Sequence, residues 1–101
     1  MFVRVWQFRP RAECVAEFES RYGPTGAWAK LFARRDGFFG TSLRRVPGTT
    51  RNYEVVDRWE SRDAWEAFQH DERDAYEQLD RDCERLSEME TLVREYDDPL
   101  S

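Results

Sequence analysis

The sequence predicts an α+β domain in which one four-stranded antiparallel sheet carries helices. Four segments are predicted to be strands, either because their side chains alternate between two faces or because of their composition. They begin near Phe2, Phe38, Asn52 and Glu90. Stripes of apolar residues at helical spacing lie between these segments and predict helices. The resulting order is strand, helix, strand, strand, helix, strand, and we expect a single domain over residues 1–101.

The first half of the chain predicts two strands and two helical stretches. In strand 2–8, one face carries Phe2, Arg4, Trp6 and Phe8, and the other carries Val3, Val5 and Gln7. A helix is expected over 11–22, with Gly23 as a left-handed cap and Pro24 beyond it. Thr25 is expected to cap the second helical stretch. Strand 38–46 follows, and Gly40 inside it indicates a bulge.

The second half of the chain predicts a hairpin, two helices and a last strand. A Pro-Gly turn at 47–48 joins strand 38–46 to strand 52–60, in which Tyr53, Val55, Asp57 and Trp59 share one face. Ser61 is expected to cap the next helix, and a longer helix covers about 70–88. A strand over about 90–96 is followed by a tail that frays from about 97. This order is that of the ferredoxin-like βαββαβ fold.

Composition excludes several classes of function. A formal net charge of −5 disfavours nucleic acid as a partner, and no apolar run is long enough to span a membrane. The two cysteines, Cys14 and Cys83, form neither a CxxC motif nor a disulfide framework, so we expect a cytoplasmic protein with reduced thiols. One histidine disfavours a zinc site, and the glycines form no GxGxxG motif. We expect no cofactor and no metal.

The first strand carries large side chains on both faces. One face is expected to pack under the helices, which leaves the other without a cover. A second copy of the sheet is the simplest cover for such a face. We therefore expect a homodimer in which the two sheets face each other.

Three segments resemble the antibiotic biosynthesis monooxygenase family of dimeric α/β barrels. They are Tyr22-Gly23-Pro24-Thr25-Gly26-Ala27-Trp28, Gly37-Phe38-Phe39-Gly40-Thr41, and Asp57-Arg58-Trp59-Glu60-Ser61 with Ala64 and Phe68 behind it. The resemblance covers nearly the whole chain. It implies oxidation of anthrones or hydroquinones by O2 without metal or flavin.

The resemblance also implies roles for particular residues. Trp59 matches the family's Trp in the Trp-Glu-Ser segment, and Trp65 matches the aromatic residue six positions later. Val55 stands where the family has an Asn. The haem-degrading branch has an Asn in the first strand and a Trp at the position of Phe68, so the resemblance to that branch is weak.

Cofactor-free oxygenation requires a base and an apolar pocket. An electron-rich phenolate or carbanion gives one electron to O2, and the radical pair then recombines. Asp57 or His70 is the candidate base, and Trp59 is the third candidate catalytic residue. The side chains expected to bind the substrate are Tyr53, Trp65, Phe32, Phe68 and Trp28. Such a pocket needs a volume of roughly 300 Å3.

A second interpretation assigns these residues no catalytic role. The aromatic residues are then core packing, and Asp57 is half of an ion pair with Arg44, Arg45 or Arg94. His70 is then a solvated residue between two helices. The protein would be a non-catalytic dimeric module that binds a small apolar ligand or only packs on itself. Val55 at the family's Asn position favours this interpretation.

Overall fold

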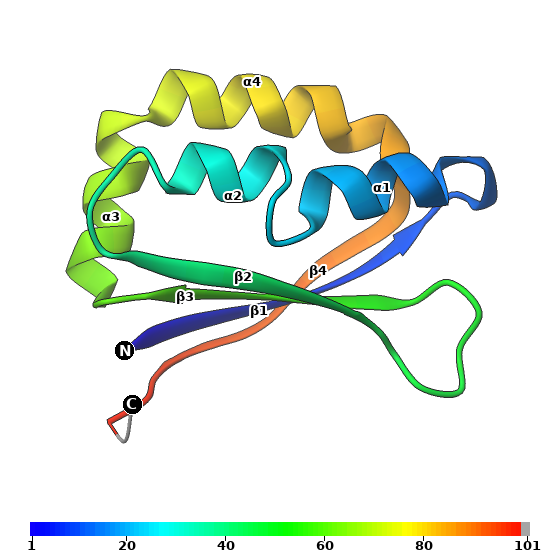
Figure 1. Cartoon of the computed structure of the whole chain (residues 1–101), viewed down its shortest axis with the longest axis horizontal. Helices are drawn as coiled ribbons and strands as arrows, with labels where there is room; N and C mark the ends of the chain where they lie inside the picture. The colour runs from blue at the N-terminus through cyan, green and yellow to red at the C-terminus, as the bar shows by residue number, and fades with distance from the viewer. Residues whose placement is uncertain (100–101) are drawn as a thin grey trace.

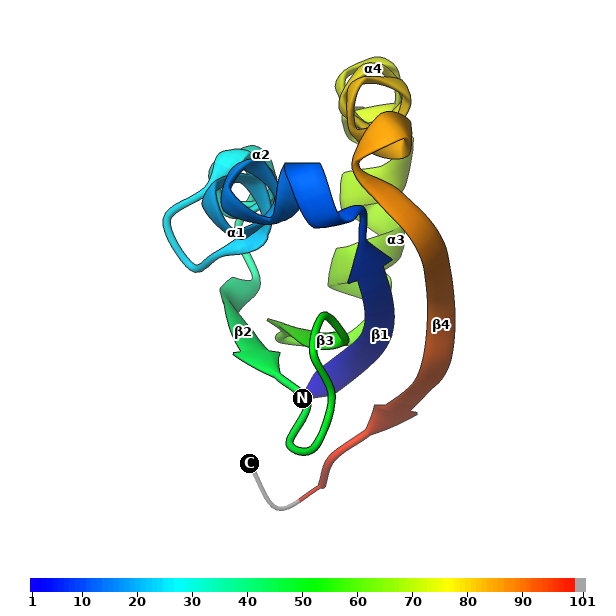
Figure 2. The same ribbon diagram turned by 90° about the vertical axis from the view of Figure 1, so that its right-hand side faces the viewer.

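One antiparallel sheet forms the base of the structure, a computed structural model that describes residues 1–99 (Figure 1). Its strands are β1 (Phe2–Pro10), β2 (Phe38–Arg45), β3 (Tyr53–Trp59) and β4 (Ser87–Asp97), in the order β2-β3-β1-β4. The helices gather on one side of this sheet, as both views show (Figures 1 and 2). The prediction of a ferredoxin-like fold is confirmed.

Four α-helices and two short 3-10 turns connect the strands. After a turn at Ala12–Cys14 come α1 (Val15–Tyr22) and α2 (Ala27–Phe32), which lead into β2. After the β2–β3 hairpin come α3 (Arg62–Asp71), α4 (Arg73–Cys83) and a turn at Glu84–Leu86. Among residues 1–99, no helix combines the length and hydropathy of a membrane span.

The helix ends test three sequence predictions. Ser61 caps α3 as expected, because its Oγ accepts a hydrogen bond from the Ala64 amide at 3.1 Å. The left-handed cap at Gly23 is wrong, since Gly23 has φ −74°. The residue that precedes α2 is Gly26, not Thr25. A Cβ at Gly26 would lie 2.3 Å from the Ser20 carbonyl oxygen, so the close approach of α1 and α2 requires glycine there.

The expected helix over 70–88 and strand over 90–96 are wrong at their ends. α3 continues through His70, the helix breaks at Glu72, and β4 begins at Ser87. The strand begins early because β1 continues to Pro10, which pairs with Ser87. A longer β1 offers more backbone N–H and C=O groups, so β4 can form more hydrogen bonds with it.

The chain end is paired for longer than expected. β4 runs to Asp97, and the Asp98 amide donates a hydrogen bond to the Met1 carbonyl at 2.7 Å. Fraying therefore does not begin at residue 97. The rest of the predicted tail, residues 100–101, lies outside the described residues.

The hairpin of β2 and β3 contains the predicted bulge. Gly40 has φ +131°, and the pairing shifts between Phe38 and Gly40. Phe38 therefore pairs with Trp59, whereas Thr41 pairs with Asp57. The shift brings Thr41 onto the helix-covered face, because directly paired residues lie on the same side of a sheet.

The opposite face of the sheet carries fewer exposed apolar side chains than the alternation predicts. Val3 and Val5 are only 2% exposed, since β1 is a central strand with β3 and β4 beside it. Phe39 and Tyr96 are the large apolar side chains that remain on this face, at 57% and 42% exposed. Tyr96 pairs with Val3 and therefore lies on the same side of the sheet.

Candidate active site

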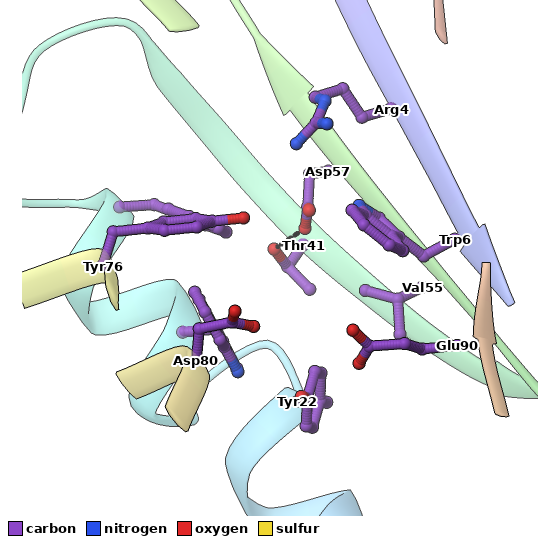
Figure 3. A pocket seen from close by; sticks show the side chains of 11 residues that line it. Arg4, Trp6, Tyr22, Thr41, Val55, Asp57, Tyr76, Asp80 and Glu90 are labelled. Atoms are coloured by element: carbon purple, nitrogen blue, oxygen red, sulfur yellow. Dashed lines mark hydrogen bonds between the residues drawn. The ribbon is translucent and has the colours of Figure 1, made fainter. Parts of the chain in front are cut away.

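A pocket lies between the helix-covered face of the sheet and helices α1, α2 and α4 (Figure 3). Its volume is about 40 Å3, which is room for a few water molecules and not for an aromatic ring. Five of its eleven lining residues are aromatic, and charged groups lie at two ends. The lining residues are Arg4, Trp6, Tyr22, Trp28, Phe32, Thr41, Val55, Asp57, Tyr76, Asp80 and Glu90.

Asp57 is the buried acid of this pocket. Its side chain comes from the middle of β3, and the residue is 5% exposed. Oδ1 accepts a hydrogen bond of 2.5 Å from the Thr41 hydroxyl. Burial raises the pKa of Asp57 to about 6, although the Thr41 hydrogen bond and the Arg4 charge act in the opposite direction. A carboxylate with such a pKa is a suitable base near neutral pH.

Arg4 is the buried cation next to Asp57. It pairs with Asp57 across β1 and β3, and Figure 3 shows its guanidinium turned toward the Asp57 carboxylate. Nε donates to the Glu95 carboxylate at 2.9 Å. The guanidinium carbon lies 4.0 Å from the centre of the Trp65 ring, close enough for a cation–π interaction.

Two carboxylates face each other at the other end of the pocket. Asp80 on α4 and Glu90 on β4 turn toward one another in Figure 3. Among the described residues, neither carboxylate has an ion pair or a hydrogen bond. Burial raises the pKa of both, and the nearby Asp80 and Glu84 charges raise that of Glu90 further. This end of the pocket therefore repels anions.

The aromatic walls are held by edge-to-face packing. The Trp28 ring on α2 lies 5.2 Å from that of Tyr76 on α4, and 5.8 Å from that of Phe32. These distances are typical of favourable aromatic pairs. Burial raises the pKa of Tyr76, so its hydroxyl stays protonated at neutral pH.

The pocket includes three of the residues selected from the sequence. Asp57, Phe32 and Trp28 line it. Four others pack in the core beside it and do not line it: Trp59, Tyr53, Trp65 and Phe68.

His70 lies apart from this group. Its ring is 86% exposed, and Nδ1 is 3.2 Å from the Asp71 carboxylate. His70 therefore lies on the surface near the end of α3 and does not line this pocket.

The predicted ion-pair partners of Asp57 are also placed elsewhere. Arg44 pairs with Glu54 at 2.9 Å, and Arg45 donates to the Tyr53 hydroxyl at 3.1 Å. Both arginines come from β2, near the hairpin turn. The arginine beside Asp57 is Arg4, from a strand that is far away in the sequence.

Sequence reasoning missed several lining residues. Arg4 and Trp6 share one predicted face of the first strand with Phe2 and Phe8, but both faces carry large side chains, so alternation did not show which face lies under the helices. Thr41 reaches the pocket because of the Gly40 bulge. Tyr76 belongs to the predicted helix over about 70–88, and nothing in its spacing distinguished a pocket wall from core.

The described chain contains no group of three or more His, Cys, Asp and Glu side chains arranged to hold a metal ion. Cys14 and Cys83 are free thiols, and Cys83 is buried. The titratable groups that line the pocket are the Arg4 guanidinium, the Tyr22 and Tyr76 hydroxyls, and the carboxylates of Asp57, Asp80 and Glu90.

The model of one protein family matches residues 1–78, the antibiotic biosynthesis monooxygenases. The chain belongs to this family. No curated protein sequence matches it. Solved structures of similar fold include a mutant of SnoaB, a cofactor-independent oxygenase from Streptomyces nogalater, with 22% identity and a TM-score of 0.77 over 97% of this chain and 92% of that one.

A second structure of similar fold is MhuD, a heme-degrader from Mycobacterium tuberculosis, with two hemes bound in its active site. It is 21% identical, with a TM-score of 0.66 over all of this chain and 98% of that chain. At these identities the likeness concerns the fold. Family membership and fold together confirm the resemblance inferred from the sequence.

Proposed function

We propose that this family member is a cofactor-independent monooxygenase that oxidises a small aromatic substrate of the quinol or anthrone type with O2. The observation that carries the proposal is Asp57, a buried carboxylate with a pKa near 6 at the end of an aromatic pocket. Membership of the family and the fold shared with SnoaB, a cofactor-independent oxygenase, support it.

Asp57 is the proposed base. For an anthrone, the carboxylate takes a proton from the CH2 carbon between the two rings and leaves a carbanion conjugated with the carbonyl. The carbanion gives one electron to O2, and the carbon radical and superoxide combine into a peroxide anion. This anion takes the proton back from Asp57. Loss of the remaining C–H proton with cleavage of the O–O bond gives a ketone and water.

The walls of the pocket hold and shield the ring. Trp28, Phe32 and Tyr76 offer flat apolar surfaces, which favour an aromatic ligand and exclude water from the radical pair. Trp59 and Phe68 support this wall from behind, since the Trp59 and Phe32 ring centres lie 5.4 Å apart. Tyr53 and Trp65 are proposed to have the same supporting role.

A substrate enters only if the pocket widens. Of the eleven residues of α4, only Cys83 is buried, so this helix has the fewest buried side chains to expose when it moves outward. Movement of α4 separates Tyr76 and Asp80 from the sheet. The proposed function therefore includes an outward shift of α4 on binding.

Oxygen uptake with a panel of anthrones and hydroquinones tests the proposal. We expect uptake with at least one member of the panel, and a loss of about a hundredfold in Asp57→Asn, which keeps the shape of the side chain. Asp36→Asn, at an exposed loop position, is the matched control and should retain full activity. Equal uptake by Asp57→Asn and the parent protein would show that Asp57 is not the base.

The pocket also favours a second candidate, a non-catalytic module that binds a small ligand or only itself. Val55 lines the pocket at the family's Asn position and offers no hydrogen bond to a substrate carbonyl. The volume of about 40 Å3 is far below the roughly 300 Å3 of a typical ligand pocket. Ligand binding without oxygen uptake for the whole panel would favour this candidate.

We also propose a homodimer that buries the sheet face opposite the helices. Phe39 and Tyr96 are exposed there, at the two edge strands of the sheet, and a two-fold axis would place each against the same face of a second copy. We expect the mass of a dimer in sedimentation, and dissociation in Phe39→Glu. Phe39→Tyr should remain dimeric. A monomeric parent protein would overturn this part of the proposal.

We propose a cytoplasmic location for the protein. Cys14 and Cys83 are free, and a reducing compartment keeps such thiols unmodified. Mass spectrometry of alkylated protein taken directly from cells should show both thiols reduced. Oxidation of both would argue for another compartment.

A further inference from the structure

The terminal nitrogens of Arg4 are oriented toward the pocket, where their hydrogen-bonding neighbour in the described chain is the Tyr76 hydroxyl. Arg4 is 8% exposed and its Nε donates to Glu95, so most of its five N–H donors remain for a ligand. Packing over the Trp65 ring holds the guanidinium in place. Figure 3 shows the group turned toward Asp57 and the space beside Tyr76. A buried guanidinium with free donors is suited to bind an anion.

We infer that Arg4 binds the anionic oxygen of the ligand, so that the pocket selects aromatic compounds with an acidic hydroxyl or enol group. This inference rests on the proposed function and adds to it the chemical class of the ligand and the residue that recognises it. The ligand is bound as an oxyanion beside Arg4, with its ring between the aromatic walls. An aromatic compound of the same shape without an acidic oxygen binds more weakly.

The charge balance of the pocket supports this role. Before proton transfer, Arg4 stands next to the Asp57 carboxylate and lowers its pKa. When Asp57 takes a proton from the ligand, the negative charge moves from Asp57 to the ligand oxygen. Arg4 then stabilises the new anion, and the net charge of the buried site is unchanged. Proton transfer without a buried change in net charge avoids a large desolvation penalty.

The charges around the pocket also fix the orientation of the ligand. Asp80 and Glu90 repel an anion at one end. The hydroxyl groups of Thr41 and Tyr76 are uncharged, and Glu95 already accepts from Arg4. The anionic oxygen therefore lies at the Arg4 end, and apolar or cationic substituents point toward Asp80 and Glu90.

Binding of 4-nitrophenol tests this inference without any oxidation. This phenol is electron-poor and does not react with O2, and its anion is coloured. 4-Nitroanisole has the same ring but no acidic hydroxyl. Calorimetry near pH 7 should show that the phenol binds about tenfold more tightly than the anisole. Absorbance should show a larger fraction of phenolate in the bound state than in free solution.

Variants of Arg4 supply the decisive comparison. Arg4→Gln should remove both the preference and the increase in phenolate, and Arg4→Lys should restore part of each because it keeps the charge. The matched control is Arg62→Gln. Arg62 also lies over an aromatic ring, that of Phe2, and is 3.8 Å from Glu95, yet it does not line the pocket. Equal loss in Arg62→Gln would overturn the inference.

Asp57→Asn separates this inference from the proposed function. Removal of the carboxylate leaves Glu95 as the anion beside Arg4 and takes away the negative charge on the pocket side, so nitrophenolate should bind more tightly to this variant even though oxygen uptake is lost. Weaker binding in Asp57→Asn, or binding of neither probe to the parent protein, would overturn the role of Arg4. Absence of oxygen uptake with normal nitrophenolate binding would overturn only the monooxygenase proposal.

Discussion

The Thr41 hydroxyl donates a hydrogen bond of 2.5 Å to Oδ1 of Asp57, across the pairing of β2 with β3. This bond stabilises the charged form of a carboxylate whose burial favours the neutral form. The pKa near 6 is the outcome of these two opposed effects. Changes at either residue should therefore alter both the pH dependence and the stability of the protein.

Thr41→Val should raise the pKa of Asp57 above 6, because it removes the donor and keeps the shape of the side chain. Oxygen uptake should then begin at a higher pH than in the parent protein. A pH profile of uptake measures the shift, and NMR titration of the Asp57 carboxyl carbon measures it independently. Thr41→Ser keeps the hydroxyl and should keep the profile. A profile that moves to lower pH would contradict the assignment.

Asp57→Asn should stabilise the fold at neutral pH. The folded chain keeps the Asp57 proton up to about pH 6, whereas the ordinary pKa of an aspartic acid is 3.8. The fold therefore loses stability as the pH rises from about 4 to 6, and the loss is complete above 6. The shift corresponds to about 3 kcal/mol at pH 7.

Urea unfolding at pH 4 and pH 7.5 checks this prediction. The difference in unfolding free energy between Asp57→Asn and the parent protein should be near zero at pH 4 and largest at pH 7.5. Asp36→Asn, on the surface, should show no such change between the two pH values. A difference that is larger at pH 4 would refute the raised pKa.

Trp59→Phe should cost about 2 kcal/mol of stability, because Trp59 is wholly buried and the smaller ring leaves a cavity. Binding of 4-nitrophenol should change by less than about twofold, since Trp59 does not line the pocket. Urea unfolding and calorimetry measure the two effects. A large loss of affinity with little loss of stability would instead give Trp59 a direct contact with the ligand.

Ser61→Ala should cost about 1 kcal/mol of stability, because the amide of Ala64 loses the acceptor that caps α3. Ser61→Asp should retain most of the stability, since its carboxylate accepts the same bond and faces the positive end of the helix. Thermal unfolding of the two variants distinguishes them. Equal losses in the two variants would mean that the hydrogen bond to the Ala64 amide is not what stabilises the start of α3.

The order and type of the elements follow from local patterns. The alternation at Phe2–Phe8 and the N-cap at Ser61 act within a few residues, so they can be recognised without knowledge of contacts elsewhere. The ends of helices and strands are less predictable where pairing with a segment far away in the sequence determines them. Ser87 belongs to β4 because Pro10 pairs with it, and no pattern near Ser87 records this pairing.

The role of each aromatic residue could not be predicted in the same way. Trp59 and Phe32 were both selected from the sequence, yet only Phe32 lines the pocket. The Trp59 ring packs against Trp65 and Phe68 of α3, and which helix covers which part of the sheet is decided by contacts between separate segments of the chain. Aromatic residues of similar size and spacing serve equally well as core or as wall.

The local sequence of this protein specifies strands, helices, caps and the bulge at Gly40, since these depend on backbone preferences of neighbouring residues. The pairing of Arg4 with Asp57 does not follow from the local sequence, because it requires β1 and β3 to lie side by side in one register. The low exposure that raises the pKa of Asp57 needs α2 and α4 above the sheet. The Asp57 carboxylate loses its contact with water only when the helices pack over the sheet, so the spacing of residues in the sequence does not predict its raised pKa.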